Sequence, residues 1–191
     1  MIILSLDLSL NCSGYAVLDT SQKTKKKRII TYGNIYNKHL APDQIGLKLL
    51  HIEMVLKTLI TIFKPDVIIK EGLTGTGFGD STKLARVHGI LEKLTIGKNV
   101  EDINNKTFKK EFTGSGKAEK EEVASKCLEY IPNLIFRTDD ESDACGMAIY
   151  YSEKGNLCKW WWFWKNFCVI TKSKHIFWNG YRKVVLLHCR G

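Results

Sequence analysis

The sequence has no long apolar run. No stretch approaches the roughly 18–20 apolar residues that a membrane-spanning helix needs. The first ten residues, MIILSLDLSL, are apolar, but they lack a basic start and include Asp7, so they do not resemble a secretory signal. We therefore expect a cytoplasmic protein, with no membrane partner for residues 1–154. The hydrophobic share of 44% and charged share of 26% are typical of a globular chain rather than a disordered one.

The six cysteines form no CxxC pair, and their spacing fits no zinc site. Scattered thiols of this kind in a cytosolic protein are usually reduced, and many are buried. The sequence therefore gives no sign of a zinc centre.

Acidic residues are missing from residues 155–191, which hold seven of the 29 Lys and Arg residues and all five tryptophans. Residues 1–154 are left with 22 basic and 20 acidic residues, so the formal net charge of +9 overstates how basic they are. Binding of a polyanion must depend on where bases cluster. The change of composition at Gly155 predicts a domain of residues 1–154 followed by a separate tail.

The order of the expected elements indicates an α/β domain. Segments 2–7, 14–19 and 28–36 predict a meander of three antiparallel strands. Apolar residues recur at intervals of three and four between Ile45 and Phe63, which predicts an amphipathic helix. After Pro65 the sequence predicts, in order, a strand, a glycine-rich loop, a helix, a short strand and two more helices, over residues 66–72, 72–81, 82–96, 99–105, 117–131 and 141–154. We expect a mixed five-stranded sheet flanked by helices.

Four acidic residues stand where elements begin or end. Asp7 and Glu71 each end a predicted strand, and Asp140 and Asp143 are three residues apart at the start of the last predicted helix. Residues three apart on a helix share a face. Four converging carboxylates would repel one another unless cations lay among them, and oxygen ligands of this kind suit magnesium. The pattern therefore predicts a two-metal site for phosphodiester hydrolysis. Taken singly, each acid could instead be an ordinary turn or helix-start residue.

Five segments together resemble the RuvC-type Holliday-junction resolvases. They occur in the order of that family and are D-LSLNCS-GY at 7–15, IIKEG at 68–72, LARVHGILEKL at 84–94, TGSGKAEKEEV at 113–123 and DESDA at 140–144. The opening departs from the family, since Leu8 and Ser9 stand where many members have Pro and Gly. The ordered set covers about residues 2–154.

The resemblance implies an RNase H-like fold and a homodimer that nicks symmetrical strands of branched DNA, four-way junctions above all. It implies that Asp7, Glu71, Asp140 and Asp143 are catalytic and hold two Mg²⁺ ions per active site, with Mn²⁺ able to substitute. The family's basic residue near the scissile phosphate corresponds to Lys117 or Lys120, and its upstream lysine corresponds to Lys109. The family's aromatic residue that stacks on junction bases corresponds to Phe78.

Lysines gather around the Gly-Ser-Gly turn at 114–116. Lys109, Lys110, Lys117 and Lys120 could hold DNA phosphates there. The same lysines could instead pair with neighbouring glutamates on a solvated helix start. With the family resemblance beside them, we interpret them as DNA-binding residues.

Two other functions fit parts of the sequence. A non-catalytic protein that binds branched DNA would have the same fold. An actin-like nucleotide-binding phosphotransferase also begins with a strand, an acid and a hairpin, but DLSLN lacks the phosphate-cradling glycine of that class.

The tail of residues 155–191 has no counterpart in the resemblance. Its tryptophans and lysines suit an interfacial or partner-binding segment. It could also be a small β-rich extension, or translated sequence that was never selected for folding.

Overall fold

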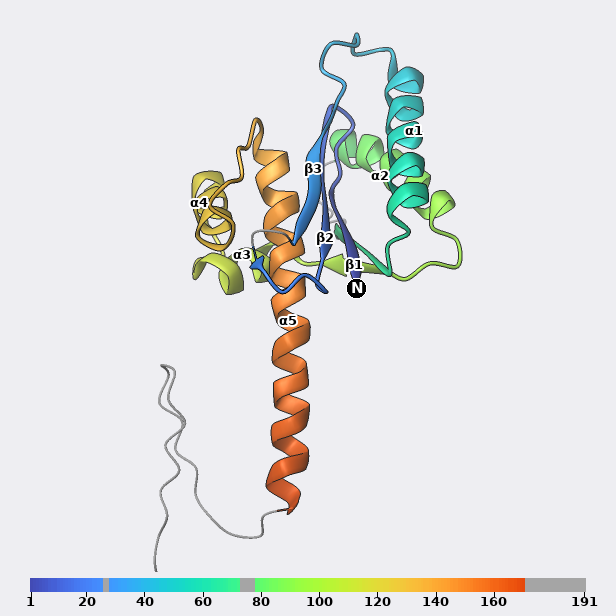
Figure 1. The fold of residues 1–191 in the computed structure, drawn as a ribbon. Coiled ribbons are helices and arrows are strands. Elements are labelled where there is room, and N and C mark those ends of the chain that lie inside the picture. The colour runs from blue at the N-terminus through green and yellow to red at the C-terminus, as the bar shows by residue number, and fades with distance from the viewer. Residues whose placement is uncertain (26–27, 73–77, 171–191) are drawn as a thin grey trace, which may run out of the picture. The chain divides into compact units, whose positions relative to one another are not determined.

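The computed structural model describes residues 1–25, 28–72 and 78–170 (Figure 1). The strands in that part are β1 Ile2–Asp7, β2 Cys12–Asp19, β3 Ile29–Tyr36, β4 Val67–Glu71 and β5 Val100–Ile103. The helices there are α1 Ile45–Phe63, α2 Phe78–Leu94, α3 Asn105–Thr113, α4 Lys120–Tyr130 and α5 Asp139–Ile170.

The strands form one mixed sheet in the order β3-β2-β1-β4-β5. β1, β2 and β3 pair antiparallel, whereas β4 pairs parallel with β1 and β5 pairs parallel with β4. β1 and β4 are buried along most of their length because both their faces are covered, which explains their continuous apolar sequences. The predicted meander and mixed five-stranded sheet are confirmed.

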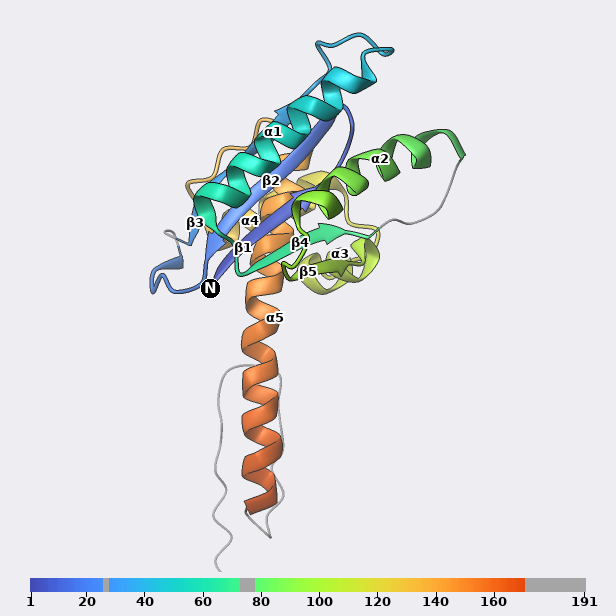
Figure 2. The same ribbon diagram turned by 90° about the vertical axis from the view of Figure 1, so that its right-hand side faces the viewer.

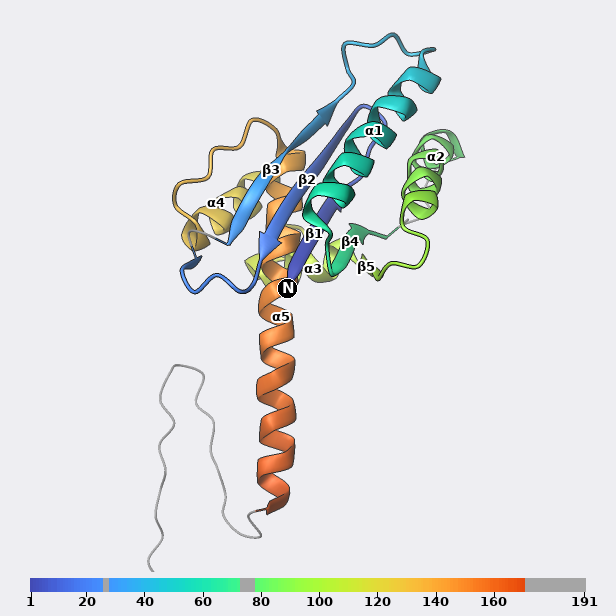
Figure 3. The same cartoon turned by 45° about the vertical axis from the view of Figure 1, so that its right-hand side comes forward.

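Helices cover both faces of the sheet (Figures 2 and 3). α1 and α2 pack on one face, over a core that contains Leu4, Leu6, Val17 and Ile68. α3, α4 and the first part of α5 pack on the other. The core on that α5-facing side contains Ile3, Ala16, Ile69, Phe108, Val123, Ala144 and Met147. Side chains alternate between these two cores along β1, β2 and β4, as strand geometry requires.

The helix predicted from the 45–63 periodicity has the bounds that were expected. The helix after the glycine-rich segment begins at Phe78, four residues before the predicted start. The expectation that the loop extends to residue 81 is therefore wrong.

The basic stretch before the Gly-Ser-Gly turn forms α3, which the sequence reading left without structure. Asn104 caps this helix by accepting a hydrogen bond from the backbone N–H of Thr107, at 3.0 Å. Phe108 and Phe112, four residues apart, bury one face. Gly114 ends the helix with a φ of 94°, which glycine adopts at little cost.

The last helix runs from Asp139 to Ile170 rather than from 141 to 154. The predicted end followed the change of composition at Gly155, but a change of composition is not a helix stop. One glycine costs only about 1 kcal/mol in a helix, and no proline follows before residue 170.

Residues 1–153 form one compact unit, and the chain from Lys154 on is assigned to a second. Among the described residues, no helix is both long and apolar enough to cross a bilayer.

Candidate active site

The carboxyl ends of β1 and β4 place Asp7 and Glu71 at the same end of the sheet. The two strands are parallel neighbours, and the last aligned pair is Leu6 with Lys70. The next residue in each strand is the terminal acid. The two acids therefore close adjacent strands at the same end.

Both acids fall on the strand positions whose side chains point to the α5-facing core. Ile3 and Ile69 belong to that core, and Asp7 and Glu71 lie an even number of residues further along their strands. Side chains at even spacing on a strand share a face. The two carboxylates therefore belong to the face that α5 covers.

Asp140 and Asp143 stand on the stripe of α5 that packs against this face. Ala144 and Met147 are buried in the α5-facing core, each four residues after one of the two acids. Positions four apart lie on the same side of a helix. Both positions therefore lie on the side of α5 that packs on the domain, and both side chains are partly buried.

Gly14 fixes where that first turn lies. It pairs with Asp7 across the β1–β2 ladder, and a Cβ placed on it would overlap the backbone carbonyl of Asp140. The start of α5 therefore rests directly on β2, beside the end of β1. Sequence analysis took this glycine as the first residue of a strand and as part of a family motif. Its position inside a strand is the signal of a close backbone approach.

The four predicted acids thus share one face and one end of the sheet. Among the described residues, however, no group of three or more His, Cys, Asp or Glu side chains is arranged to hold a metal ion. Carboxylate oxygens remain the donors that magnesium prefers, so the residue types fit such an ion. Glu71 accepts a hydrogen bond from the Asn105 side chain at 3.0 Å, which ties the end of β4 to the start of α3.

Two buried thiols lie beside the helix acids. The pKa of Cys12 is raised to about 12, first by burial and then by the hydrogen bond and negative charge of Asp140. Burial, with a smaller contribution from the charge of Asp143, raises the pKa of Cys127 to about 12. Both thiols therefore stay protonated at neutral pH. Sequence reading missed both contacts, because neither follows from local spacing.

Glu141 is the acid of this segment that supports the fold. Its side chain is 4% exposed and accepts hydrogen bonds from the Asn34 amide and the backbone N–H of Arg137, each at 2.7 Å. It joins α5 to β3 and to the loop before the helix. The acids crowded into residues 139–143 thus comprise one buried structural carboxylate, the exposed Asp139, and the partly buried Asp140 and Asp143.

The predicted DNA-binding lysines lie on α3 and on the turn after it. Lys109 is half-buried and lies one helical turn after Asn105, the residue that binds Glu71. Lys110 and Lys117 are exposed. Lys120 is the first residue of α4, and its side chain lies outside the described residues.

The start of α4 is closed by a capping box. Glu119 accepts from the backbone N–H of Glu122, and the Glu122 side chain accepts from the backbone N–H of Glu119 at 3.0 Å. These two glutamates are therefore occupied by the helix start. Phe78, the predicted stacking residue, begins α2 instead of standing in a loop, and its side chain also lies outside the described residues.

Comparison with known proteins identifies the family of this chain. The model of the family described as "Crossover junction endodeoxyribonuclease RuvC" matches residues 3–151. The protein of that name from Cytophaga hutchinsonii is 33% identical over 175 residues, which cover 87% of this chain and 84% of the relative. The one from Rickettsia bellii is 30% identical over 153 residues, with 78% of this chain and 94% of the relative covered.

Solved structures agree on the fold. Thermus thermophilus RuvC, solved in complex with a Holliday junction substrate, superposes with a TM-score of 0.68 over 81% of this chain and 96% of that one, at 18% identity. The resemblance drawn from the sequence is confirmed, and with it the RNase H-like fold of those resolvases. The chain belongs to the RuvC family of crossover junction endodeoxyribonucleases.

Proposed function

We propose that this protein is a structure-selective endonuclease that resolves Holliday junctions and related branched DNA by paired nicks. Family membership supports the reaction, and the shared face of the four acids supports the site. The start of α5 on Gly14 is the observation that carries the proposal, because it brings the helix acids to the end of β1. The assignment to this family also leaves no support for an actin-like phosphotransferase.

The family is one of metal-dependent nucleases, and we infer two Mg²⁺ ions, with Mn²⁺ able to replace them. Asp7, Glu71, Asp140 and Asp143 would hold these ions. Bound divalent ions supply an activated water and steady the leaving oxygen of a phosphodiester. The carboxylates themselves orient the ions, and Asn105 orients Glu71 through its hydrogen bond.

Binding of DNA phosphates also requires positive charge, and the lysines supply it. Lys117 or Lys120 stabilises charge on the phosphate that is attacked, and Lys109 and Lys110 hold neighbouring phosphates. A homodimer would present two such sites to the two symmetrical strands of a junction. Phe78, at the start of α2, would stack on an unpaired base near the exchange point.

Cleavage of a fluorescently labelled four-way junction tests the proposal. With Mg²⁺ we expect symmetrical nicks on a denaturing gel, and we expect Asp7→Asn and Asp143→Asn to abolish them while junction binding persists. Asp139→Asn is the matched control, because Asp139 is an exposed acid in the same helical turn. Cleavage that survives in both Asp7→Asn and Asp143→Asn contradicts the assigned site.

A non-catalytic protein that binds branched DNA is the second candidate. One observation favours it: among the described residues, no three or more His, Cys, Asp or Glu side chains are arranged to hold a metal ion. Tight junction binding with no nicking in either Mg²⁺ or Mn²⁺ would establish it.

We propose that residues 155–191 are not needed for the nuclease reaction, since the sheet and both cores lie in residues 1–153. A chain ending at Lys154 should then cut junctions at the full-length rate. Loss of cleavage with an unchanged melting temperature would instead identify the tail as a DNA- or partner-binding segment.

A further inference from the structure

A cavity of about 540 Å³ lies along β3, the edge strand of the sheet, beside the start of α5. Its lining is polar and aromatic and comes mainly from Tyr15, Tyr32, Gly33, Asn34, Arg137 and Glu141. We propose that this cavity binds one nucleotide of the DNA strand beside the cleaved bond and so sets which sequences are cut. The proposal rests on the nuclease function proposed above and adds a specificity site to it.

The cavity adjoins the candidate acids through α5 itself. Asp140 and Glu141 are consecutive residues in the first turn of that helix. The carbonyl of Asp140 lies against Gly14, while the side chain of Glu141 binds Asn34. Gly14 and Asn34 are themselves paired across the β2–β3 ladder. A DNA strand held at the acids would therefore place its neighbouring nucleotide at the cavity.

One aromatic wall is held rigid. The Tyr32 hydroxyl accepts from the backbone N–H of Ile135 at 2.9 Å and donates to the carbonyl of the same residue at 3.1 Å. Its ring also meets Phe136 edge to face, with centroids 5.7 Å apart. Because this side chain is already fixed in the folded protein, a base that stacks there does not have to order it.

The second aromatic wall depends on a missing side chain. A Cβ on Gly33 would lie 2.9 Å from the Tyr15 hydroxyl oxygen, so the Tyr15 side chain occupies the space beside this glycine. Tyr15 packs against the core under α1, whereas Tyr32 packs against the α5-facing core. The cavity therefore wraps around the outer edge of β3 and has an aromatic ring on each side.

The polar groups suit a nucleotide rather than a free anion. The buried carboxylate of Glu141 would repel an isolated phosphate, but its oxygens accept hydrogen bonds from base amino groups. The exposed side chain of Arg137 brings the positive charge that a phosphate of the same nucleotide requires. The lining thus offers polar groups for a base and for a phosphate.

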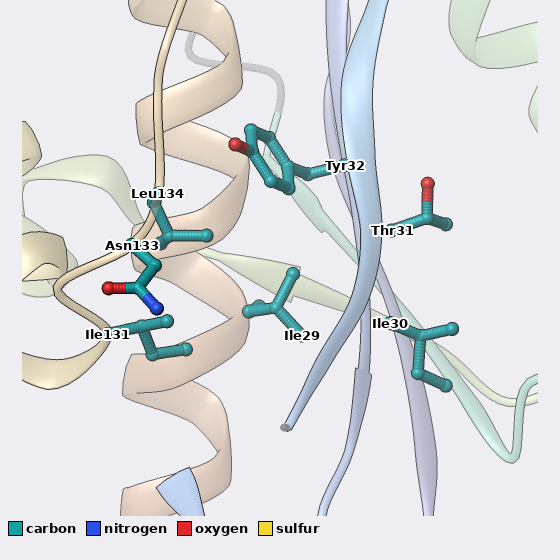
Figure 4. Close-up of a pocket in the computed structure, with 7 residues that line it drawn as sticks. All are labelled: Ile29, Ile30, Thr31, Tyr32, Ile131, Asn133 and Leu134. Atoms are coloured by element: carbon teal, nitrogen blue, oxygen red, sulfur yellow. The ribbon is translucent and has the colours of Figure 1, made fainter. Parts of the chain in front are cut away.

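A neighbouring cavity provides the contrast. Its volume is about 300 Å³, and its lining holds no charged residue and includes Ile29, Ile131 and Leu134 (Figure 4). Figure 4 shows Ile29 and Tyr32 pointing from β3 toward the 131–134 segment, whereas Ile30 and Thr31 lie on the other side of the strand. Tyr32 lines both cavities, but only the larger one combines rings with charged groups.

Nick-site mapping on junctions randomised around the exchange point tests the proposal. Gly33→Ala narrows the cavity, and we expect it to change the preference at one base position beside the nick by about tenfold, as loss of one base contact would. Arg137→Ala should lower the slope of log affinity against log salt by about 1, as loss of one phosphate contact does. Lys57→Ala, which removes an exposed positive charge from α1, is the matched control and should leave the base preference unchanged.

Photo-crosslinking separates failure of the cavity from failure of the nuclease function. Junctions carrying 4-thiothymidine beside the cleavage position are bound in Ca²⁺ and irradiated, and we expect crosslinks to the peptide that contains Tyr32. The cavity proposal alone is overturned if the protein cuts junctions but gives no such crosslink, or if Gly33→Ala keeps the base preference and Arg137→Ala keeps the salt slope. A protein that neither binds nor cuts overturns the nuclease function and the cavity with it. If Gly33→Ala fails to fold, Arg137→Ala and the crosslink still decide, because that arginine side chain is exposed.

Discussion

Gly14 and Asp140 touch through their backbones: a Cβ on Gly14 would overlap the carbonyl oxygen of Asp140. This contact joins β2 to the first turn of α5, and Gly14 is in turn the ladder partner of Asp7. The relative position of a strand acid and a helix acid thus depends on a residue that has no side chain.

Gly14→Ala should therefore remove cleavage and destabilise the fold. The added methyl group forces the start of α5 away from β2, and overpacking of this kind costs about 1–3 kcal/mol. Chemical denaturation measures the loss, and the junction assay measures activity. Gly89→Ala is the control, because no described atom beyond the neighbouring backbone of α2 itself lies within 4 Å of its Cβ position. Alanine there should stabilise the protein by up to about 1 kcal/mol.

Glu141→Gln tests the structural carboxylate. Glutamine can accept one of the two hydrogen bonds from Asn34 and the backbone of Arg137, but it presents an N–H group to the other donor. We expect a loss of about 1–3 kcal/mol in the free energy of unfolding. Asp139→Asn, an exposed change in the same turn, should cost far less. Equal effects of the two substitutions would show that the hydrogen bonds of Glu141 contribute little.

Local sequence rules predicted the elements whose signal lies within one segment. The period of apolar residues gave α1 its bounds, and alternating or continuous apolar segments gave the first three strands. Asn104 and the Phe108–Phe112 pair carried an equally local signal for α3. The segment was interpreted only as a basic stretch because of its many lysines.

The contacts that build the site could not be predicted in this way. The approach of Gly14 to α5 and the burial of Glu141 depend on how a helix lies on a sheet more than 100 residues away in sequence. The family resemblance pointed to the acids, since it compares whole ordered sets of segments. It did not show that Glu141, between Asp140 and Asp143, serves the fold.

Ser5→Ala should leave the protein as stable as before or make it more stable. Ser5 is fully buried on β1, and its hydroxyl finds no hydrogen-bond partner within the described part of the chain. Removing an unsatisfied buried polar group relieves a desolvation cost of about 1–3 kcal/mol. Thermal melting is the measurement. A clear loss of stability would mean that the hydroxyl makes a hydrogen bond in solution, for instance to a buried water.

Divalent ions should raise the melting temperature of the protein in the absence of DNA. A ligand at 100 times its Kd stabilises the folded state by about 2.7 kcal/mol. We expect a concentration-dependent shift with Mg²⁺ and Mn²⁺ in the unchanged protein and in Asp139→Asn. The shift should disappear in Asp143→Asn. If Asp143→Asn retains the full shift, the ions bind elsewhere.

His88 should make stability fall in mild acid. Its side chain is 3% exposed on α2, and its Nδ1 has no hydrogen-bond partner among the described residues. Burial, together with the positive charge of Lys70, lowers its pKa, although Asp102 and Glu92 act in the opposite direction. The unfolded chain therefore binds a proton near the usual pKa of about 6.5, whereas the folded protein does not. Protonation favours unfolding, so stability should be constant above that pH and decline as the pH falls below it.

Urea denaturation of the unchanged protein and of His88→Gln between pH 5 and 8 measures this effect. The difference in unfolding free energy between the two should shrink as the pH falls, because only the histidine binds the extra proton on unfolding. His39→Gln is the control, since His39 stacks on the exposed Tyr36 at the end of β3. Parallel pH profiles for the unchanged protein and His88→Gln would show that His88 titrates alike in the folded and unfolded states.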